Sequence, residues 1–306
     1  MQEILKRAYS YASDYLDQGI VADYIPELGK EDRNNLAGVL IDKDKEIYKI
    51  GLHDYKFSIQ SISKIAIYLC VLETCGFEEI KRYVGVKPTS KPFNSIIELE
   101  LSNKRIPVNP FINAGAIVCT SLLQKKYGKD TFDVILNKLM LLTDNENLDY
   151  SNSIFNSEKK TSYANRALAN LMLSHNIISR ELDIDEFLDS YFKSCSVMVS
   201  TLDLAKMSYA LSEDGINYSG KSVLSFENAR IIRTLMATCG TYDYSGEFAM
   251  RIGVPAKSGV GGGIVTAFIN KFGLATYCPG LDSHGNSYCG MRFLNSVSDD
   301  LNLKIY

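Results

Sequence analysis

The sequence predicts a multi-layer protein of the α+β class, in which one antiparallel sheet is built from both ends of the chain. The predicted strands lie near those two ends: 37–41, 47–50, 263–269 and 272–277. Between about 68 and 230 the apolar residues recur at helical spacing instead. Strands at both ends with helices between them favour a sheet into which a mostly helical lobe is inserted. We expect one domain over 1–306, with a sheet lobe over about 1–67 and 231–306 and a helical lobe over about 68–230.

The first elements follow from local patterns. An amphipathic helix is predicted over 2–18, because four residues fall on one stripe: Ile4, Ala8, Tyr11 and Tyr15. Tyr24-Ile25-Pro26 then requires an extended or turned backbone, since the residue before a proline avoids the helical region. The stretches 37–41 and 47–50 are joined by the polar run Asp42-Lys-Asp-Lys-Glu46, which predicts a hairpin.

The rest of the chain shows helical patterns first, then two strand patterns and a final helix. Its middle part carries five helical patterns: 131–142, 161–176, 184–194, 200–213 and 225–237. After Pro255 the pattern changes to that of strands, and 263–269 with 272–277 is predicted to form a second hairpin. Residues 287–300 are predicted to form a closing helix.

Composition and charge are those of an ordinary globular chain, and they exclude several classes of function. Of the 306 residues 46% are hydrophobic and 23% charged, and the net charge of −3 gives no indication of nucleic acid or an anionic membrane as a partner. No apolar run approaches the roughly 20 residues that span a bilayer, and the N-terminus carries no apolar secretion signal. The seven scattered cysteines form no C-x-x-C pair, and the three histidines lie far apart. We therefore expect a cytoplasmic protein with reduced thiols, without a metal site or a histidine-based triad.

The most informative stretch holds the pattern Ser61-x-x-Lys64 just before a strongly apolar run. On a helix, positions i and i+3 share a face, so the Ser61 hydroxyl and the Lys64 amine can touch. A lysine serves as the base for a serine nucleophile only when its amine is partly neutral, and burial lowers a lysine pKa. The same pattern is also common as a solvated helix start with Ser61 as N-cap, so alone it does not establish catalysis.

A second pattern, Lys257-Ser258-Gly259, precedes a glycine-rich turn. A phosphate-binding loop is excluded, because its lysine follows the glycines whereas Lys257 precedes them. One interpretation is a flexible turn before a strand. The other is a strand whose missing side chain at Gly259 lets substrate approach the backbone. Ser-x-x-Lys followed far downstream by Lys-[Ser/Thr]-Gly marks the serine enzymes of the β-lactamase and penicillin-binding group, and two such marks are stronger than one.

Further stretches place polar side chains in unusual settings. Asn113 lies within an apolar frame, where a buried amide needs partners that a ligand could supply. Glu158 and Asn165 are seven residues apart and would share a face on a continuous helix, although a capped helix start with a solvated face is the plainer interpretation. Tyr191 is by default a core aromatic residue. Tyr242, in a glycine-rich loop before the second pattern, is by default a half-exposed one.

Together these stretches resemble the serine-dependent glutaminases, the family of bacterial glutaminase and of the catalytic domain of the animal enzymes. The resemblance runs from about Tyr24 to the C-terminus. Its motifs are Tyr24-Ile-Pro, Ile59-Gln-Ser-Ile-Ser-Lys64, Asn109-Pro-Phe-Ile-Asn-Ala-Gly-Ala-Ile117, Ser157-Glu with Asn165, Tyr191-Phe-x-x-Cys-Ser, Cys239-Gly-Thr-Tyr-Asp-Tyr-Ser-Gly246 and Pro255-Ala-Lys-Ser-Gly-Val260. It implies a β-lactamase-like fold, a homodimer or homotetramer, and hydrolysis of L-glutamine to L-glutamate and ammonia without a metal or organic cofactor.

The resemblance also implies roles for the matching residues. Ser61 is expected to be the nucleophile, Lys64 its general base and Tyr242 a second member of the proton relay. The oxyanion is expected between the backbone N–H groups of Ser61 and Val260, where losing one donor typically costs about 3–4 kcal/mol. Glu158 is expected to bind the α-ammonium group of glutamine. The other residues expected around the substrate are Tyr24, Gln60, Asn113, Asn165 and Tyr191, with Lys257, Ser258 and Gly259 in support.

Several alternatives stay open at this point. Arg166 follows Asn165, whereas many relatives carry an arginine just before that asparagine, so the helix register there is open. A β-lactam-reactive serine hydrolase of the same fold is the rival enzyme, although the chain contains no Ser-Asp-Asn. A catalytically inactive binding protein is the alternative outside enzymes, although the expected catalytic residues are all present. Asparagine is a further possible substrate, because one methylene contributes only about 1–3 kcal/mol of discrimination.

Overall fold

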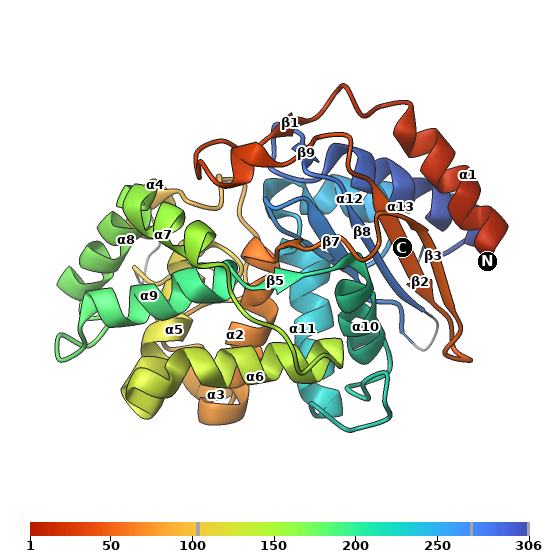
Figure 1. Ribbon diagram of the computed structural model, residues 1–306. Helices are drawn as coiled ribbons and strands as arrows, with labels where there is room; N and C mark the ends of the chain where they lie inside the picture. The colour runs from red at the N-terminus through yellow and green to blue at the C-terminus, as the bar shows by residue number, and fades with distance from the viewer. Residues whose placement is uncertain (102–104, 270–271, 305–306) are drawn as a thin grey trace.

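The computed structural model describes residues 1–101, 105–269 and 272–304 (Figure 1). Its centre is a five-stranded antiparallel sheet in the order β3-β2-β8-β7-β6. The strands are β2 (Ala37–Ile41), β3 (Ile47–Gly51), β6 (Ala256–Ser258), β7 (Gly263–Thr266) and β8 (Gly273–Tyr277). Because β2 pairs with β8, the two ends of the chain form one sheet, which confirms the predicted fold class.

Both predicted hairpins are present. Strands β2 and β3 pair around a turn in which the Asp42 side chain accepts hydrogen bonds from the backbone N–H groups of Asp44 and Glu46. Strand β7 ends at Thr266, earlier than the predicted end at 269. Two further pairings involve short strands: β1 (Ile20–Val21) with β9 (Gly280–Leu281), and β4 (Phe57–Ser58) with β5 (Met198–Val199).

Alternating side chains along the strands give the sheet two apolar faces. Val39 belongs to the core that the sheet shares with α10 (Thr201–Ser212). Its neighbour Leu40 belongs to the core shared with α1 (Gln2–Ser13) and α13 (Tyr288–Leu301). Helices therefore cover both faces of the sheet. Helix α10 packs on β8 and β2, although it lies within the region expected to form the helical lobe.

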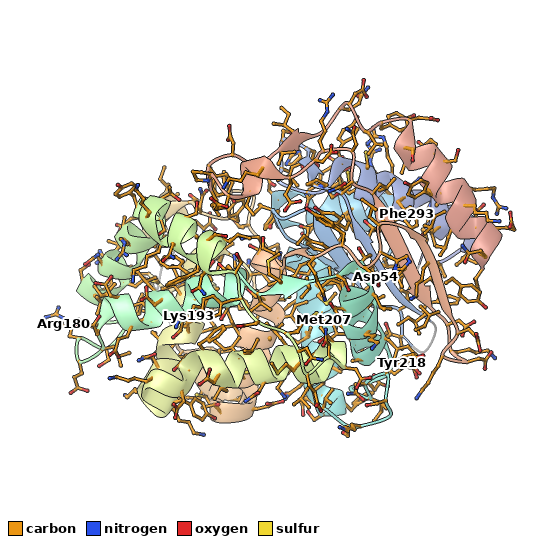
Figure 2. All side chains as sticks on the ribbon, viewed as in Figure 1. Asp54, Arg180, Lys193, Met207, Tyr218 and Phe293 are labelled. Atoms are coloured by element: carbon orange, nitrogen blue, oxygen red, sulfur yellow. The ribbon has the colours of Figure 1, made fainter. Side chains whose placement is uncertain are left out.

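The sheet packs tightly against a covering helix at Gly38. A Cβ atom at this position would overlap the ring of Phe293, which is labelled in Figure 2. Helix α1, on the same face, ends at Ser13 and not at the predicted 18. The Ser13 hydroxyl donates to the carbonyl of Tyr9, and such local side-chain bonds compete with continuation of a helix.

Most of the remaining helices gather to one side of the sheet in Figure 1. The remaining helices are α2 (Lys64–Cys75), α3 (Phe77–Ile80), α4 (Ile96–Leu101), α5 (Asn113–Tyr127), α6 (Thr131–Thr143), α7 (Asn152–Thr161), α8 (Tyr163–Ser174), α9 (Ile184–Cys195), α11 (Phe226–Cys239) and α12 (Ser245–Arg251). Helix α12 is an exception to the grouping, because its Phe248 belongs to the core shared with α1 and α13. Helices α6, α9, α10, α11 and α13 match their predicted ranges closely. The predicted helix 161–176 is wrong at its start, because a break at Ser162 separates α7 from α8.

Helix α2 has no polar face. Every residue from Lys64 to Leu72 is buried, as expected for a helix that is apolar all round. It packs against α5, α6 and α11, and its N-terminus meets the end of β6. The buried helix thereby brings the Ser61-x-x-Lys64 pattern to the junction between the sheet and the other helices.

Candidate active site

A cavity of about 100 Å³ lies at the N-terminal end of α2, between the end of β6 and helices α5, α7, α8 and α9. Eight of the residues predicted to bind substrate line it: Tyr24, Gln60, Ser61, Asn113, Glu158, Asn165, Tyr191 and Val260. The predicted catalytic residues Lys64 and Tyr242 are buried beside them and do not line the cavity. The structure therefore brings together residues that are scattered over most of the sequence.

Ser61 lies in a 3₁₀ turn, Gln60–Ser63, that leads directly into α2. The predicted regular helix thus begins only at Lys64. In a 3₁₀ turn, positions i and i+3 eclipse, so the two residues of the pattern still face the same side. The preceding Gln60 has a φ of 47°, a left-handed conformation that is uncommon for a residue other than glycine. Strain of this kind clusters at functional sites.

The glycine-rich segment after β6 packs directly on this turn. A Cβ atom at Gly259 would lie 2.8 Å from the carbonyl oxygen of Ile59, and one at Gly261 would collide with the carbonyl oxygen of Ser58. Side chains at these positions would push the two segments apart. The glycines therefore allow a close approach between two protein segments. That Gly259 also lets substrate approach the backbone stays a prediction.

This approach leaves two backbone donors beside the cavity. Among the residues that the structure describes, neither the Ser61 nor the Val260 backbone N–H donates a hydrogen bond to another protein group. Both residues line the cavity. Two unengaged N–H groups at one cavity wall are what an oxyanion would require.

Lys64 is fully buried. Its amine donates hydrogen bonds to the carbonyl of Phe111 at 3.1 Å and to Asn113 Oδ1 at 2.7 Å. Burial lowers the pKa of Lys64 to about 8, and the nearby Cys195 and Glu158 oppose this shift. Part of the amine is therefore neutral near physiological pH, and this neutral form can accept a proton.

Three amide and hydroxyl groups connect the helices around the cavity. Asn113 Nδ2 donates to Asn165 Oδ1 at 2.9 Å, and the Tyr191 hydroxyl donates to Asn113 Oδ1 at 3.4 Å. These bonds join the N-termini of α5 and α8 to the middle of α9. Asn113 thus satisfies its buried amide within the protein, and it also fixes the amine of Lys64.

Glu158 and Asn165 reach the cavity from two consecutive helices. The prediction that they share a face of one continuous helix is wrong, because the chain breaks at Ser162. The Ser162 hydroxyl donates to the carbonyl of Lys159, which closes the last turn of α7. Both residues nevertheless line the same cavity.

Glu158 is the one buried carboxylate among the lining residues. Its side-chain atom Oε2 is buried and has no hydrogen-bond partner among the described residues. Burial raises the pKa of Glu158 to about 8, against the opposing effects of Lys64 and of a hydrogen bond with Gln60. A buried carboxylate oxygen without a donor is costly, so a ligand that supplies a donor would be favoured here.

Tyr242 lies in the left-handed region, with a φ of 61°. Its hydroxyl donates to the carbonyl of Ser258 at 3.2 Å. Burial raises the pKa of Tyr242 to about 12, while hydrogen bonding with Ser61 and Ser258 lowers it. The amine of Lys257 lies 4.4 Å from the centre of the Tyr242 ring, and burial lowers the pKa of Lys257 well below its usual range. The predicted catalytic and supporting residues therefore form one buried group.

Sequence reasoning missed part of the cavity wall: Ile25, Phe93, Asn94, Thr161, Ser162, Ala164 and Cys195. Cys195 lies one helical turn after Tyr191 on α9, so helical spacing could have revealed it. Phe93 packs against Tyr242 with ring centres 4.8 Å apart. It belongs to a loop without periodic apolar pattern, which offers no signal in the sequence.

Within residues 1–101, 105–269 and 272–304, no three His, Cys, Asp or Glu side chains are grouped so that they could hold a metal ion. No helix in the same ranges is long and apolar enough to cross a membrane.

The antiparallel sheet with helices on both faces and a polar cavity at one end places the chain in the β-lactamase-like fold class. A family model described as Glutaminase matches residues 19–306. The chain therefore belongs to the glutaminase family, which confirms the resemblance and the prediction of an amidohydrolase.

Relatives support this assignment over the full length. The chain is 41% identical to Glutaminase of Clostridium tetani over 308 residues and 40% identical to Glutaminase 2 of Clostridium perfringens over 307 residues, with 100% of both chains covered in each case. A solved structure of probable glutaminase ybaS is 35% identical, with a TM-score of 0.94 and coverage of 100% of this chain and 97% of that one. The probable glutaminase of Bacillus subtilis complexed with 6-diazo-5-oxo-L-norleucine is 28% identical, with a TM-score of 0.90 and the same coverage.

Proposed function

We propose that this chain hydrolyses L-glutamine to L-glutamate and ammonia through a covalent acyl-enzyme on Ser61. The observation that carries the proposal is the unpartnered Oε2 of Glu158, a residue that lines the same cavity as Ser61. A carboxylate there would receive the α-ammonium group of a free amino acid. The side-chain amide of that amino acid would then lie toward Ser61.

In the acylation step, Lys64 takes the proton of the Ser61 hydroxyl as Oγ forms a bond to the amide carbon. The backbone N–H groups of Ser61 and Val260 stabilise the negative oxygen of the tetrahedral intermediate. The proton then passes from Lys64 through the Tyr242 hydroxyl to the amide nitrogen. The carbon–nitrogen bond breaks, ammonia leaves, and an ester joins Ser61 to the glutamyl group.

In the deacylation step, a water molecule attacks the ester carbon and gives a proton to Lys64. The bond between the carbon and Ser61 Oγ breaks, and Lys64 returns the proton to the serine. The new carboxylic acid releases its remaining proton to solvent, and glutamate leaves with both carboxylates ionised. The lowered pKa of Lys64 supports both steps, because the amine must accept and release a proton in each.

The test is ammonia release from L-glutamine by the wild type and by Ser61→Ala, with L-asparagine assayed alongside. We expect activity on glutamine in the wild type and background activity in the variant. Ser121→Ala is a matched control, because this buried hydroxyl donates to the carbonyl of Val118 in its own helix, away from the cavity lining. Full activity of Ser61→Ala would contradict the mechanism. Absence of glutamine hydrolysis, together with rapid acylation by a penicillin, would favour the β-lactam-reactive alternative.

The setting of the enzyme is part of the same proposal. We propose a cytoplasmic homodimer or homotetramer. The seven cysteines are all free, which fits a reducing compartment. Light scattering of the purified protein gives the oligomer mass, and a monomer at micromolar concentration would contradict the oligomeric part.

A further inference from the structure

Asn286, in the turn after β9, is a buried side chain that connects two segments of the candidate site. It has no exposed surface. Its Oδ1 accepts a hydrogen bond from the Ser258 hydroxyl at 2.6 Å, and its Nδ2 donates to the carbonyl of Thr241 at 3.5 Å. The turn itself is fixed, because the Asp282 carboxylate accepts hydrogen bonds from the backbone N–H groups of His284 and Asn286.

The Thr241 carbonyl and the Ser258 hydroxyl, which Asn286 binds, both belong to residues that adjoin Tyr242 in the chain or in space. Thr241 directly precedes Tyr242, so the bond to its carbonyl holds the backbone of the tyrosine. The carbonyl of Ser258 accepts the Tyr242 hydroxyl, so the bond to the Ser258 side chain holds the other end. One amide group thereby fixes the position of the tyrosine from two sides.

Tyr242 needs such support because of its backbone. A φ of 61° is unfavourable for a residue other than glycine, and it persists only where the surroundings impose it. A backbone hydrogen bond from Ser258 to Gly240 also joins the two segments, but it reaches the chain two residues before Tyr242. The Ser245 hydroxyl donates to the carbonyl of Tyr242 itself at 2.9 Å and holds its backbone only. Asn286 binds at the adjacent residue and also binds Ser258, whose carbonyl accepts the tyrosine hydroxyl, so its amide constrains both ends of the tyrosine.

We propose that Asn286 is a positioning residue for the reaction, holding the Tyr242 hydroxyl beside Ser61 without touching the substrate. Asn286 does not line the cavity, so it is not placed to bind glutamine. This inference rests on the proposed role of Tyr242 in proton transfer. Loss of the amide should therefore slow the chemical step and leave substrate binding unchanged.

Two variants test the proposal in the full-length protein. Asn286→Ala removes both hydrogen bonds. Asn286→Asp keeps the size and the acceptor for Ser258 but replaces the donor to Thr241 with an oxygen. We expect kcat to fall about 10- to 100-fold, because displacing a reacting group by about 1 Å costs a factor of that order, with KM within about twofold of wild type. A rise in KM without a fall in kcat would overturn the inference.

The decisive comparison is made in the Tyr242→Phe background. If Asn286 acts through the tyrosine hydroxyl, Tyr242→Phe lowers kcat and the added Asn286→Ala causes no further loss. A further loss as large as in the wild-type background would overturn the inference. Wild-type activity of Tyr242→Phe alone would instead contradict the proposed proton relay. Should Asn286→Ala fail to fold, Asn286→Asp provides the same comparison.

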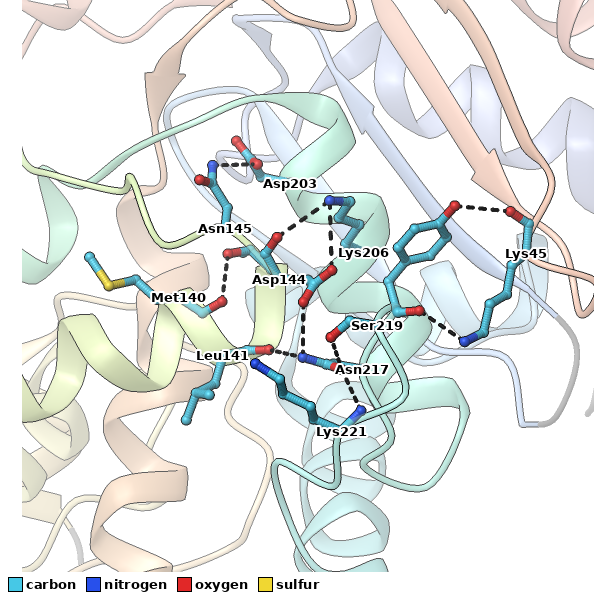
Figure 3. Close-up of polar contacts among 12 residues, drawn as sticks. Lys45, Met140, Leu141, Asp144, Asn145, Asp203, Lys206, Asn217, Ser219 and Lys221 are labelled. Atoms are coloured by element: carbon cyan, nitrogen blue, oxygen red, sulfur yellow. Dashed lines mark hydrogen bonds and ion pairs between the residues drawn. The ribbon is translucent and has the colours of Figure 1, made fainter.

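Asn217 is a matched control for a merely structural role (Figure 3). It is also buried, and its Nδ2 donates to the carbonyl of Leu141 at 3.1 Å and to Asp144 Oδ1 at 3.3 Å. It does not line the cavity. We expect Asn217→Ala to lower the Tm about as much as Asn286→Ala and to leave kcat unchanged. An equal loss of kcat in both variants would show general destabilisation and overturn the inference.

Discussion

At the scale of single residues, the site is governed by two buried ionisable groups whose pKa values are shifted toward each other. Burial lowers the pKa of Lys64 to about 8 and raises that of Glu158 to about 8. Each group in its charged form favours the charged form of the other. The charge state of the cavity is therefore most sensitive to pH close to that value.

We expect kcat/KM for L-glutamine to rise as the pH increases through about 8. The mechanism needs neutral Lys64 and ionised Glu158, and both forms gain population in that direction. The measurement is the pH profile of kcat/KM. Repeating it at each pH in a second buffer controls for effects of the buffer itself. A profile that falls over the same interval would contradict the assignment of Lys64 as the base.

The same shifts predict how stability depends on pH. From 4.5 to about 8, the carboxyl of Glu158 is ionised in the unfolded chain but protonated in the folded protein, so its contribution makes stability fall as pH rises. From about 8 to 10.5, the unfolded lysine holds a proton that folded Lys64 has lost, so its contribution makes stability rise. Urea unfolding across this range measures the sum. The first effect should disappear in Glu158→Gln and the second in Lys64→Met.

Glu158→Gln is also expected to raise KM for L-glutamine about 10- to 100-fold, with a smaller effect on kcat. The amide has the same shape but loses the charge, and a hydrogen bond to a charged group contributes about 1.5–3 kcal/mol. Steady-state kinetics provide the measurement. Glu227→Gln, on the exposed side of α11, is the matched control and should behave as wild type. An unchanged KM in Glu158→Gln would show that Glu158 does not bind the α-ammonium group.

At the scale of elements, the sequence predicts regular segments well and their interruptions poorly. The ranges of α6, α9 and α10 follow from apolar periodicity, which a long amphipathic helix imposes on its sequence. The break at Ser162 and the 3₁₀ turn at Ser61 depend on a few local bonds and on packing against distant segments. Such contacts leave no periodic trace, so the interruptions had to be found in the structure.

Several site residues could be recognised in the sequence for a related reason. Asn113 and Lys64 are polar residues within apolar stretches, and a buried polar side chain stands out in a sequence. Asn286 and Phe93 were not found, because a loop asparagine and a loop phenylalanine are ordinary in their context. Their importance follows only from the segments that the fold brings against them.

One contact between elements bears on the position of Glu158. The amine of Lys193, labelled in Figure 2, lies 5.4–5.8 Å from the ring centres of Phe132, Tyr150 and Phe155. These residues come from α9, from α6, from the segment before α7 and from α7 itself. A cation among three aromatic faces is attracted by each of them. The cluster therefore fixes α7, which carries Glu158, against α9.

We expect Lys193→Met to lower the free energy of unfolding by about 0.5–2 kcal/mol, because methionine keeps the length of the side chain and removes its attraction to the rings. Urea unfolding is the measurement. Lys160→Met, at an exposed position on α7, is the control and should change stability by less than about 0.5 kcal/mol. Equal stability of the two variants would show that the aromatic cluster contributes only through its apolar contacts.

At the scale of the whole molecule, the two ends of the chain are held together by the sheet and by the helix behind it. Strand β2 pairs with β8, and α13 packs on the same face as α1. The sequence predicts both hairpins, but the choice of which hairpin edges meet depends on contacts between residues more than 200 positions apart, as in the pair Leu40↔Leu274. The division into a sheet lobe and a helical lobe stays a prediction.

The joining of the chain ends can be tested at Gly38, where a side chain would collide with the Phe293 ring. Gly38→Ala should therefore force β2 and α13 apart and destabilise the protein by about 1–3 kcal/mol. Gly246→Ala is the matched control, since an added Cβ meets nothing within 4 Å there, and alanine in a helix should stabilise by about 0.5–1 kcal/mol. Urea unfolding of both variants gives the comparison. Because Gly38 lies away from the cavity, kcat of folded Gly38→Ala should equal that of wild type. Unchanged stability of Gly38→Ala would mean that the C-terminal helix can shift freely on the sheet, and the close contact would then not be what holds the two ends together.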